Sequence, residues 1–178
     1  MHLAEGVDDQ TTIVTYSVTF HVTKAFEASV GDVEAYVDIL IEETNDGYIN
    51  SGVPLRVAKH CIKISDLEEE LSTEMLAKFR TSAPVSELLD SADIAFLLVK
   101  ESSFCGVAYF NTRTMPLGLA TQGCARGYYS FGHEIGHIFG ANHNREVTSS
   151  KYCPYCYGYL IKPKGPTEYS GYRTIMRY

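Results

Sequence analysis

One eleven-residue segment, from His133 to His143, restricts what this chain can fold into more than any other feature. It places histidines at both ends and at position 137, with Glu134 beside the first of them and a glycine at position 140. Residues four apart on an α-helix differ by about 40° in azimuth, so the first two histidines would project from one helix face, one turn apart. Gly140 can adopt the positive φ at which helices commonly end, and the chain can then turn and bring His143 towards the other two.

Three imidazoles that converge in this way form a ligand set for Zn²⁺. Three protein ligands leave the fourth position to water, which distinguishes catalytic zinc sites from closed structural ones. We therefore predict that His133, His137 and His143 bind the metal, which lowers the pKa of its bound water towards about 7. Glu134 is the predicted catalytic base, taking the proton from that water and passing it to the leaving amine. The alternative is an amphipathic helix whose histidines only pack or face solvent, but the glycine and the third histidine both argue against it.

The extended motif resembles that of the metzincin zinc endopeptidases. The second signature of that clan is a methionine turn, and Thr174-Ile175-Met176-Arg177-Tyr178 is similar to it, with Met176 lying 33 residues after His143. The resemblance implies that Met176 forms a hydrophobic floor under the zinc without binding it. Tyr178 stands where a tyrosine ligates zinc or stabilises the transition state in the astacin and serralysin branches, so it is a candidate for oxyanion stabilisation.

The reprolysin-like (adamalysin) branch is similar along the whole chain. The similarity includes the stretches NDGYINSGV at 45–53 and SADIAFLLV at 91–99, and Gly-Cys-Ala at 123–125. Two positions depart from that branch: Asn144 stands where it usually has Asp, and the turn at 174–176 reads TIM rather than CIM.

The length of 178 residues and the lack of a linker predict one domain. The resemblance implies that residues 1–178 are a metallopeptidase catalytic domain, without the helix that usually follows the methionine turn. The implied fold is α/β (α+β): a mixed, twisted sheet with an edge strand along the cleft, and two main helices. The same resemblance implies an inhibitory propeptide that blocks the zinc, as in a zymogen.

Residue patterns along the chain independently predict a mixed sheet with helices packed against it. Residues 93–99 form a continuous apolar run, which is typical of a strand covered on both faces. The acidic stretches 66–80 and 84–91 are moderately helical and are expected at the surface. The predicted strands are 11–22, 53–64, 93–99, 105–111 and 117–122, the two main helices are 30–46 and 127–139, and the chain after 144 is expected to be loop-like.

The metzincin resemblance also implies that an extended substrate lies between an edge strand and the metal. The candidate edge strand is 106–110, whose unpaired backbone groups would bind a peptide by strand addition. Its candidate substrate-binding residues are Gly106, Val107, Ala108 and Tyr109. The alternative, that this segment is a paired interior strand, remains open at this stage.

Five cysteines favour an oxidising compartment and at least one disulfide, so we expect a secreted protein. Cys105 and Cys124 are expected to pair and brace the cleft. Cys153 and Cys156 are expected in a local or longer-range disulfide, and Cys61 could pair with either of them or with a residue beyond the chain. The CPYC motif at 153–156 also matches glutaredoxin-like redox proteins, but the residues after it are poor helix formers, and that chemistry needs a helix N-terminus.

Charge and hydropathy exclude other partners. The formal net charge is -7 and no lysine- or arginine-rich run occurs, so a nucleic-acid partner is not expected. No apolar stretch approaches the roughly 20 residues of a membrane-spanning helix, and residues 1–10 do not resemble a signal peptide, so the chain looks like a mature fragment. His2, His21 and His60 have no ligand spacing, and Ser130 lacks the GxSxG context of a serine hydrolase.

Together these features predict a secreted, monomeric, zinc-dependent endopeptidase that cleaves peptide or protein substrates. A metzincin-like binding protein or toxin component with little proteolysis is the first alternative, although retention of Glu134 argues against it. A thiol-disulfide oxidoreductase using Cys153 is the second alternative.

Overall fold

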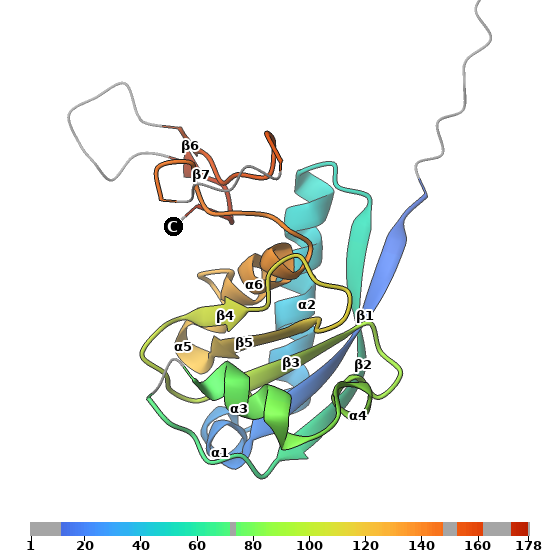
Figure 1. The fold of residues 1–178 in the computed structure, drawn as a ribbon, viewed down its shortest axis with the longest axis vertical. Helices are drawn as coiled ribbons and strands as arrows, with labels where there is room; N and C mark the ends of the chain where they lie inside the picture. Colours follow the sequence, from blue (N-terminus) through green and yellow to red (C-terminus); the bar gives the residue numbers. More distant parts are fainter. Residues whose placement is uncertain (1–11, 72–73, 148–152, 162–171, 178) are drawn as a thin grey trace, which may run out of the picture.

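A mixed five-stranded sheet forms the centre of the structure (Figure 1). The computed structural model describes residues 12–71, 74–147, 153–161 and 172–177. The strand order is β2-β1-β3-β5-β4, in which β4 runs antiparallel to β5 and all other neighbours are parallel. The strands are β1 (Val14–Thr23), β2 (Leu55–Ser65), β3 (Ile94–Val99), β4 (Gly106–Ala108) and β5 (Leu117–Thr121). The predicted mixed α/β fold is confirmed.

Helices cover both faces of this sheet, as the apolar run in β3 predicts. Alternate β3 residues Ile94, Phe96 and Leu98 pack in one core with α1, α2 and α6, and the residues between them pack in a second core with α3 and α4. Figure 1 shows α2 behind the sheet and α3 and α4 in front of it. The helices are α1 (Lys24–Val30), α2 (Val33–Asn50), α3 (Met75–Ser82), α4 (Val85–Leu89), α5 (Gln122–Ala125) and α6 (Ser130–Ile138).

The helix predicted at 30–46 is the second of two helices in the structure. Gly31 at φ 74° ends α1, and the Asp32 carboxylate then accepts a hydrogen bond from the backbone N–H of Ala35 at 2.9 Å and caps α2. Helix α1 was not predicted, although Thr23 caps it by the same type of bond to Phe26. Its seven residues are too few to show a clear helical period.

The helix predicted at 127–139 begins only at Ser130. Gly127 and Tyr129 both have positive φ, 67° and 59°, so the backbone enters the helix through a tight turn. Gly140 then follows the helix at φ 90°, as predicted for its end.

Two other segments differ from the prediction. Among the described residues of 66–80, the helix begins at Met75, and α3 continues to Ser82. The region after 144, expected to be loop-like, contains a two-stranded antiparallel ribbon of β6 (Leu160–Ile161) and β7 (Tyr172–Arg173). Within the described ranges, no helix has the length and apolar character that crossing a membrane requires.

Candidate metal centre and cleft

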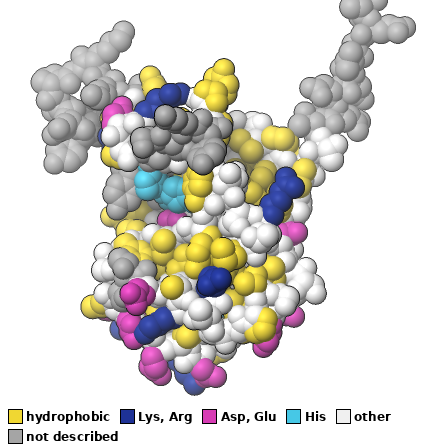
Figure 2. Space-filling model, viewed as in Figure 1, with side chains coloured by type: hydrophobic (Ala, Val, Ile, Leu, Met, Phe, Trp, Pro, Cys, Tyr) yellow, Lys and Arg dark blue, Asp and Glu magenta, His cyan; other side chains and the backbone are white. Residues whose placement is uncertain are grey.

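Helix α6 presents two histidines to solvent because its other face is anchored in the core. Phe131, Ile135 and Ile138 follow helical spacing and are buried, and the Phe131 ring packs on the aromatic rings of β1 and β3. His133 and His137 project from a different face and are half-buried. Figure 2 shows histidine side chains reaching the surface beside hydrophobic side chains.

The turn after Gly140 brings His143 to the same point. Its Nε2 atom lies 3.0 Å from the Nε2 atom of His133 and 3.0 Å from that of His137. Two nitrogen atoms that bind one tetrahedral zinc ion lie roughly 3.3 Å apart. Asn142 fixes this turn because its N–H donates to the Cys156 carbonyl at 2.5 Å.

The hydrogen bonds of the imidazoles show that the three nitrogens suit a cation. Nδ1 of His133 lies 2.8 Å from the carbonyl oxygen of Ile175, and Nδ1 of His137 lies 2.8 Å from that of Ala141. A carbonyl oxygen only accepts, so both Nδ1 atoms carry protons and both neutral rings turn an Nε2 lone pair inward. His143 carries at most one proton on Nε2, so at least one of the two 3.0 Å contacts sets lone pair against lone pair. A divalent cation among the three nitrogens removes that repulsion.

The protonation states favour the same conclusion. Burial lowers the pKa of His133 and His143, and it lowers the pKa of His137 to about 4. At neutral pH the three rings are therefore uncharged, which is the form that binds a metal.

Glu134 lies beside the three histidines and is 4% exposed. Its Oε2 atom is buried and has no hydrogen-bond partner in the structure. Burial raises the pKa of this carboxyl to about 8, whereas a metal cation at the imidazoles would stabilise the ionised form. A buried, unpartnered carboxylate at this place can accept and return a proton.

Because of this burial, we predict that Glu134→Gln raises the melting temperature of the metal-free chain. Between the ordinary pKa of 4.5 and about 8, the folded state binds more protons than the unfolded state, so the free energy of unfolding falls as pH rises. Glutamine does not ionise, so the advantage of the variant should grow across this window and level off above it. Thermal melts in chelator across this range measure the difference, and a difference independent of pH would contradict the prediction.

The edge strand β4 forms the opposite wall of the cleft. It pairs with β5 on one side only and ends the sheet, so the structure places it at an edge rather than in the interior. It is shorter than predicted, although the N–H of Tyr109 still donates to the Leu117 carbonyl at 3.0 Å. A cleft of about 230 Å³ is lined by Gly106, Val107, Ala108, Phe110, His133, Glu134, His137 and His143.

Gly106 gives Glu134 its space. A Cβ atom at this position would lie 2.7 Å from Oε1 of Glu134 and 2.9 Å from the carbonyl oxygen of Leu119. Any larger residue would therefore push the carboxyl group or the strand out of place. No sequence pattern indicates this role, because the contact joins residues that lie far apart in the chain.

Met176 packs directly against the metal helix. A Cβ atom at Gly136 would lie 2.4 Å from Sδ of Met176, and one at Gly158 would lie 2.5 Å from the carbonyl group of Met176. Two glycines thus allow the methionine turn to approach α6, and Ile175 in the same turn accepts the hydrogen bond from His133. Gly136 and Gly158 were not singled out from the sequence. Tyr178, the candidate for oxyanion stabilisation, lies outside the described residues.

Two disulfides brace this region. Cys105 pairs with Cys124, joining the start of the edge strand to α5, and Cys153 pairs with Cys156. Cys61 is a free thiol, so its suggested pairing with Cys153 or Cys156 does not occur. The Cys153–Cys156 disulfide spans a turn rather than a helix N-terminus, so the helix dipole that redox chemistry would need is missing there.

His21 and His60 lie away from the cleft, and His2 lies outside the described residues. His21 is buried, with Nε2 2.8 Å from the Leu88 carbonyl, and is a core residue. His60, Cys61 and Asp90 each place one possible ligand atom within 4.8 Å of the others. The sequence did not indicate this group, which forms where an irregularity in the β1–β2 register falls at His60. The ammonium group of Lys63 already lies 2.8 Å from the Asp90 carboxylate, and we assign the group no function.

Comparison with known proteins agrees with this geometry. A relative from Stenotrophomonas maltophilia (strain K279a), a peptidyl-Asp metalloendopeptidase, is 34% identical over 164 residues, which cover 86% of this chain and 39% of the relative. A protein of the same name from Pseudomonas fragi is 33% identical over 138 residues, which cover 76% of this chain and 72% of that protein. The chain thus spans well under half of the Stenotrophomonas protein.

A solved structure described as a chaperone-substrate complex superposes with a TM-score of 0.70 over 92% of this chain and 30% of that one. The two are 19% identical, so this likeness shows the fold alone. The sequence model of metallopeptidase family M12 matches residues 12–178, which is nearly the whole chain. This match confirms the metzincin resemblance. This chain belongs to metallopeptidase family M12.

Proposed function

We propose that this chain is the catalytic domain of a zinc-dependent endopeptidase that hydrolyses internal peptide bonds. The observation that carries the proposal is the convergence of three neutral imidazoles, from His133, His137 and His143, beside the buried carboxyl group of Glu134. Zinc fits this donor set, and when bound it would supply the Lewis acidity that polarises a peptide carbonyl and acidifies water.

The residues of the chain then perform three tasks. The free edge of β4 binds the substrate backbone in extended form by strand addition and holds the scissile bond over the cleft. Glu134 accepts a proton from the attacking water and returns it to the leaving amine. Met176, packed on the glycine between two ligand histidines, supports the metal helix from below. Tyr178 remains a candidate for stabilising the oxyanion.

The names of the relatives support a finer proposal about the substrate. Both aligned proteins are peptidyl-Asp metalloendopeptidases, and we propose that this chain also cleaves beside aspartyl residues. The two disulfides support secretion into an oxidising compartment. A single catalytic domain and a monomeric active form complete the proposal, together with an inhibitory propeptide that rests on the metzincin resemblance.

Metal removal tests this function. Cleavage of casein by the purified chain is expected to stop in the presence of a chelator and to return when zinc is added after dialysis. The measurement is the rate of release of soluble peptides, together with the zinc content. A chain that binds no zinc and releases no peptides would support the alternative of a metzincin-like binding protein, and cleavage that a chelator does not affect would contradict the role of the metal.

A further inference from the structure

A second pocket, of about 600 Å³, is lined by residues that directly follow the third histidine and the methionine of the turn. One wall begins at Asn144, directly after the ligand His143, and another includes Arg177, directly after Met176. Because the sulfur of Met176 packs against the metal helix at Gly136, both walls are tied to the histidine cluster. The pocket therefore lies within reach of a substrate held at that cluster.

The two arginines of this pocket differ in how their guanidinium groups are engaged. Arg145 lies 4.5 Å from the centre of the Tyr157 ring and donates a hydrogen bond to the carbonyl of Pro154. Nε of Arg177, in contrast, is buried and has no hydrogen-bond partner in the structure. A buried donor without a partner is unfavourable, so the guanidinium group of Arg177 has hydrogen-bonding capacity left for a ligand that brings an acceptor.

Among the described residues that line the pocket, Glu146 is the single acidic residue, against the two arginines. Glu146 accepts a hydrogen bond from the Asn144 amide at 2.6 Å. Asn144 itself is neutral, so it does not repel an anion as a carboxylate there would. The sequence shows the same bias: residues 145–178 contain six Lys or Arg against two Asp or Glu, whereas residues 1–144 contain nine against twenty.

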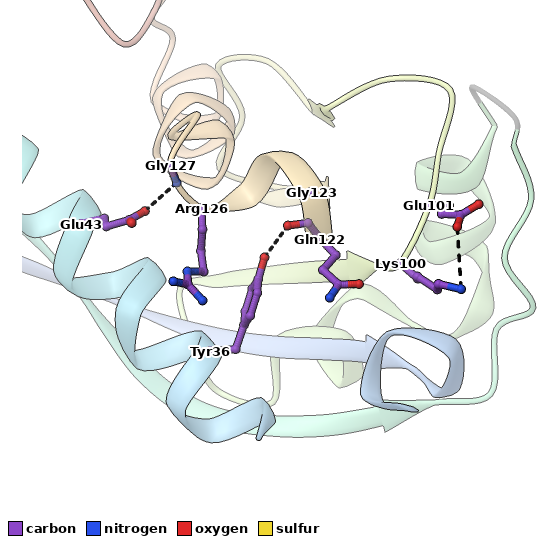
Figure 3. A pocket seen from close by; sticks show the side chains of 8 residues that line it. All are labelled: Tyr36, Glu43, Lys100, Glu101, Gln122, Gly123, Arg126 and Gly127. Atoms are coloured by element: carbon purple, nitrogen blue, oxygen red, sulfur yellow. Dashed lines mark hydrogen bonds and ion pairs between the residues drawn. The ribbon is translucent and has the colours of Figure 1, made fainter. Parts of the chain in front are cut away.

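Another pocket of similar size is lined by a balanced set of charged side chains (Figure 3). In that pocket, of about 590 Å³, Arg126 stacks over the Tyr36 ring at 5.3 Å and Glu43 accepts a hydrogen bond from the Gly127 N–H at 3.1 Å. Nζ of Lys100 lies 3.7 Å from Oε1 of Glu101, so these two residues form an ion pair. Its positive and negative groups are equal in number, so nothing there selects an anion.

We propose that the pocket beside Arg177 binds the carboxylate side chain of the substrate residue next to the scissile bond, and that Arg177 pairs with it. This inference rests on the proposed endopeptidase function and assigns its aspartate preference to one residue. An extended chain advances only about 3.3 Å per residue, so a side chain adjacent to the scissile bond stays close to the histidines, where the pocket begins. The planar guanidinium group can bind a carboxylate through two parallel hydrogen bonds.

The test compares two peptides with amidated C-termini that differ only in Asp or Asn at one position. The Asp/Asn ratio of kcat/KM is expected to fall at least tenfold in Arg177→Gln, because hydrogen bonds to charged groups contribute about 1.5–3 kcal/mol. The kcat/KM for the Asn peptide is the internal reference for each variant, so a general loss of activity cancels in the ratio. Arg126→Gln, which removes an arginine from the pocket of Figure 3, is the matched control and should keep the wild-type ratio.

Two results would overturn the assignment: an unchanged ratio in Arg177→Gln, or a ratio that Arg145→Gln alone abolishes. If Arg177→Gln does not fold, Arg177→Lys replaces it. This variant keeps the charge but loses the two parallel bonds, so it should lower the ratio several-fold, and an unchanged ratio would overturn the pairing.

The affinity ratio for the same peptides, measured by fluorescence anisotropy in a Glu134→Gln background, needs no turnover. If the wild-type chain, loaded with zinc, cleaves neither peptide while binding of the Asp peptide still depends on Arg177, the endopeptidase function is refuted and the pocket assignment stands.

Discussion

Glu134→Gln is expected to lower kcat by about 10²- to 10⁴-fold while the zinc content stays at the wild-type level. The substitution keeps the size of the side chain, and Glu134 contributes no atom to the three-nitrogen cluster, so the metal site should persist. What is lost is the only carboxyl group among the residues that line the cleft described in the structure. An amide cannot take a proton from water and return it to the leaving amine.

Steady-state kinetics on a quenched peptide, together with zinc analysis of the same preparation, measure both parts of this prediction. Glu43→Gln is a suitable control, because Glu43 lies in the pocket of Figure 3 and not in the cleft. A Glu134→Gln chain with near-normal kcat would show that another group is the base. A chain that loses its zinc would show instead that Glu134 holds the metal site together.

The part of the site that could be predicted is the part encoded locally. His133, His137 and Glu134 lie within five consecutive residues, and helical geometry alone decides how they project. Gly140 was predicted to end the helix because glycine can adopt a positive φ, and its φ of 90° agrees with that prediction. The apolar run of β3 likewise predicted burial on both faces without knowledge of its neighbours.

The rest depends on contacts between distant parts of the chain. The carbonyl of Ile175 fixes the tautomer of His133 across 42 residues, and Gly106 makes room for Glu134 across 28 positions of sequence. No periodicity or spacing marks such contacts. The unpartnered Nε of Arg177 could not be predicted either, because only the fold shows which arginines already have hydrogen-bond or ring contacts.

Gly136→Ala is expected to weaken zinc binding by about 10- to 100-fold, the usual cost of disturbing a group that orients a metal ligand. The added Cβ would lie 2.4 Å from Sδ of Met176, so the methionine turn must move away from α6. Ile175 belongs to that turn and accepts the 2.8 Å hydrogen bond from Nδ1 of His133. The clash is therefore transmitted to the orientation of a ligand, and peptidase activity should fall with zinc occupancy.

The matched control is Gly123→Ala, because a Cβ atom at Gly123 would meet nothing within 4 Å. Zinc affinity, measured by competition with a chromogenic chelator, should be unchanged in this control. Combining Gly136→Ala with Met176→Ala removes the sulfur from the clash, so the double variant should bind zinc no more weakly than Met176→Ala alone. Such non-additivity is the signature of two residues in direct contact. If the two losses simply add, or if Gly136→Ala binds zinc like the wild type, the methionine turn does not control the metal site through this contact.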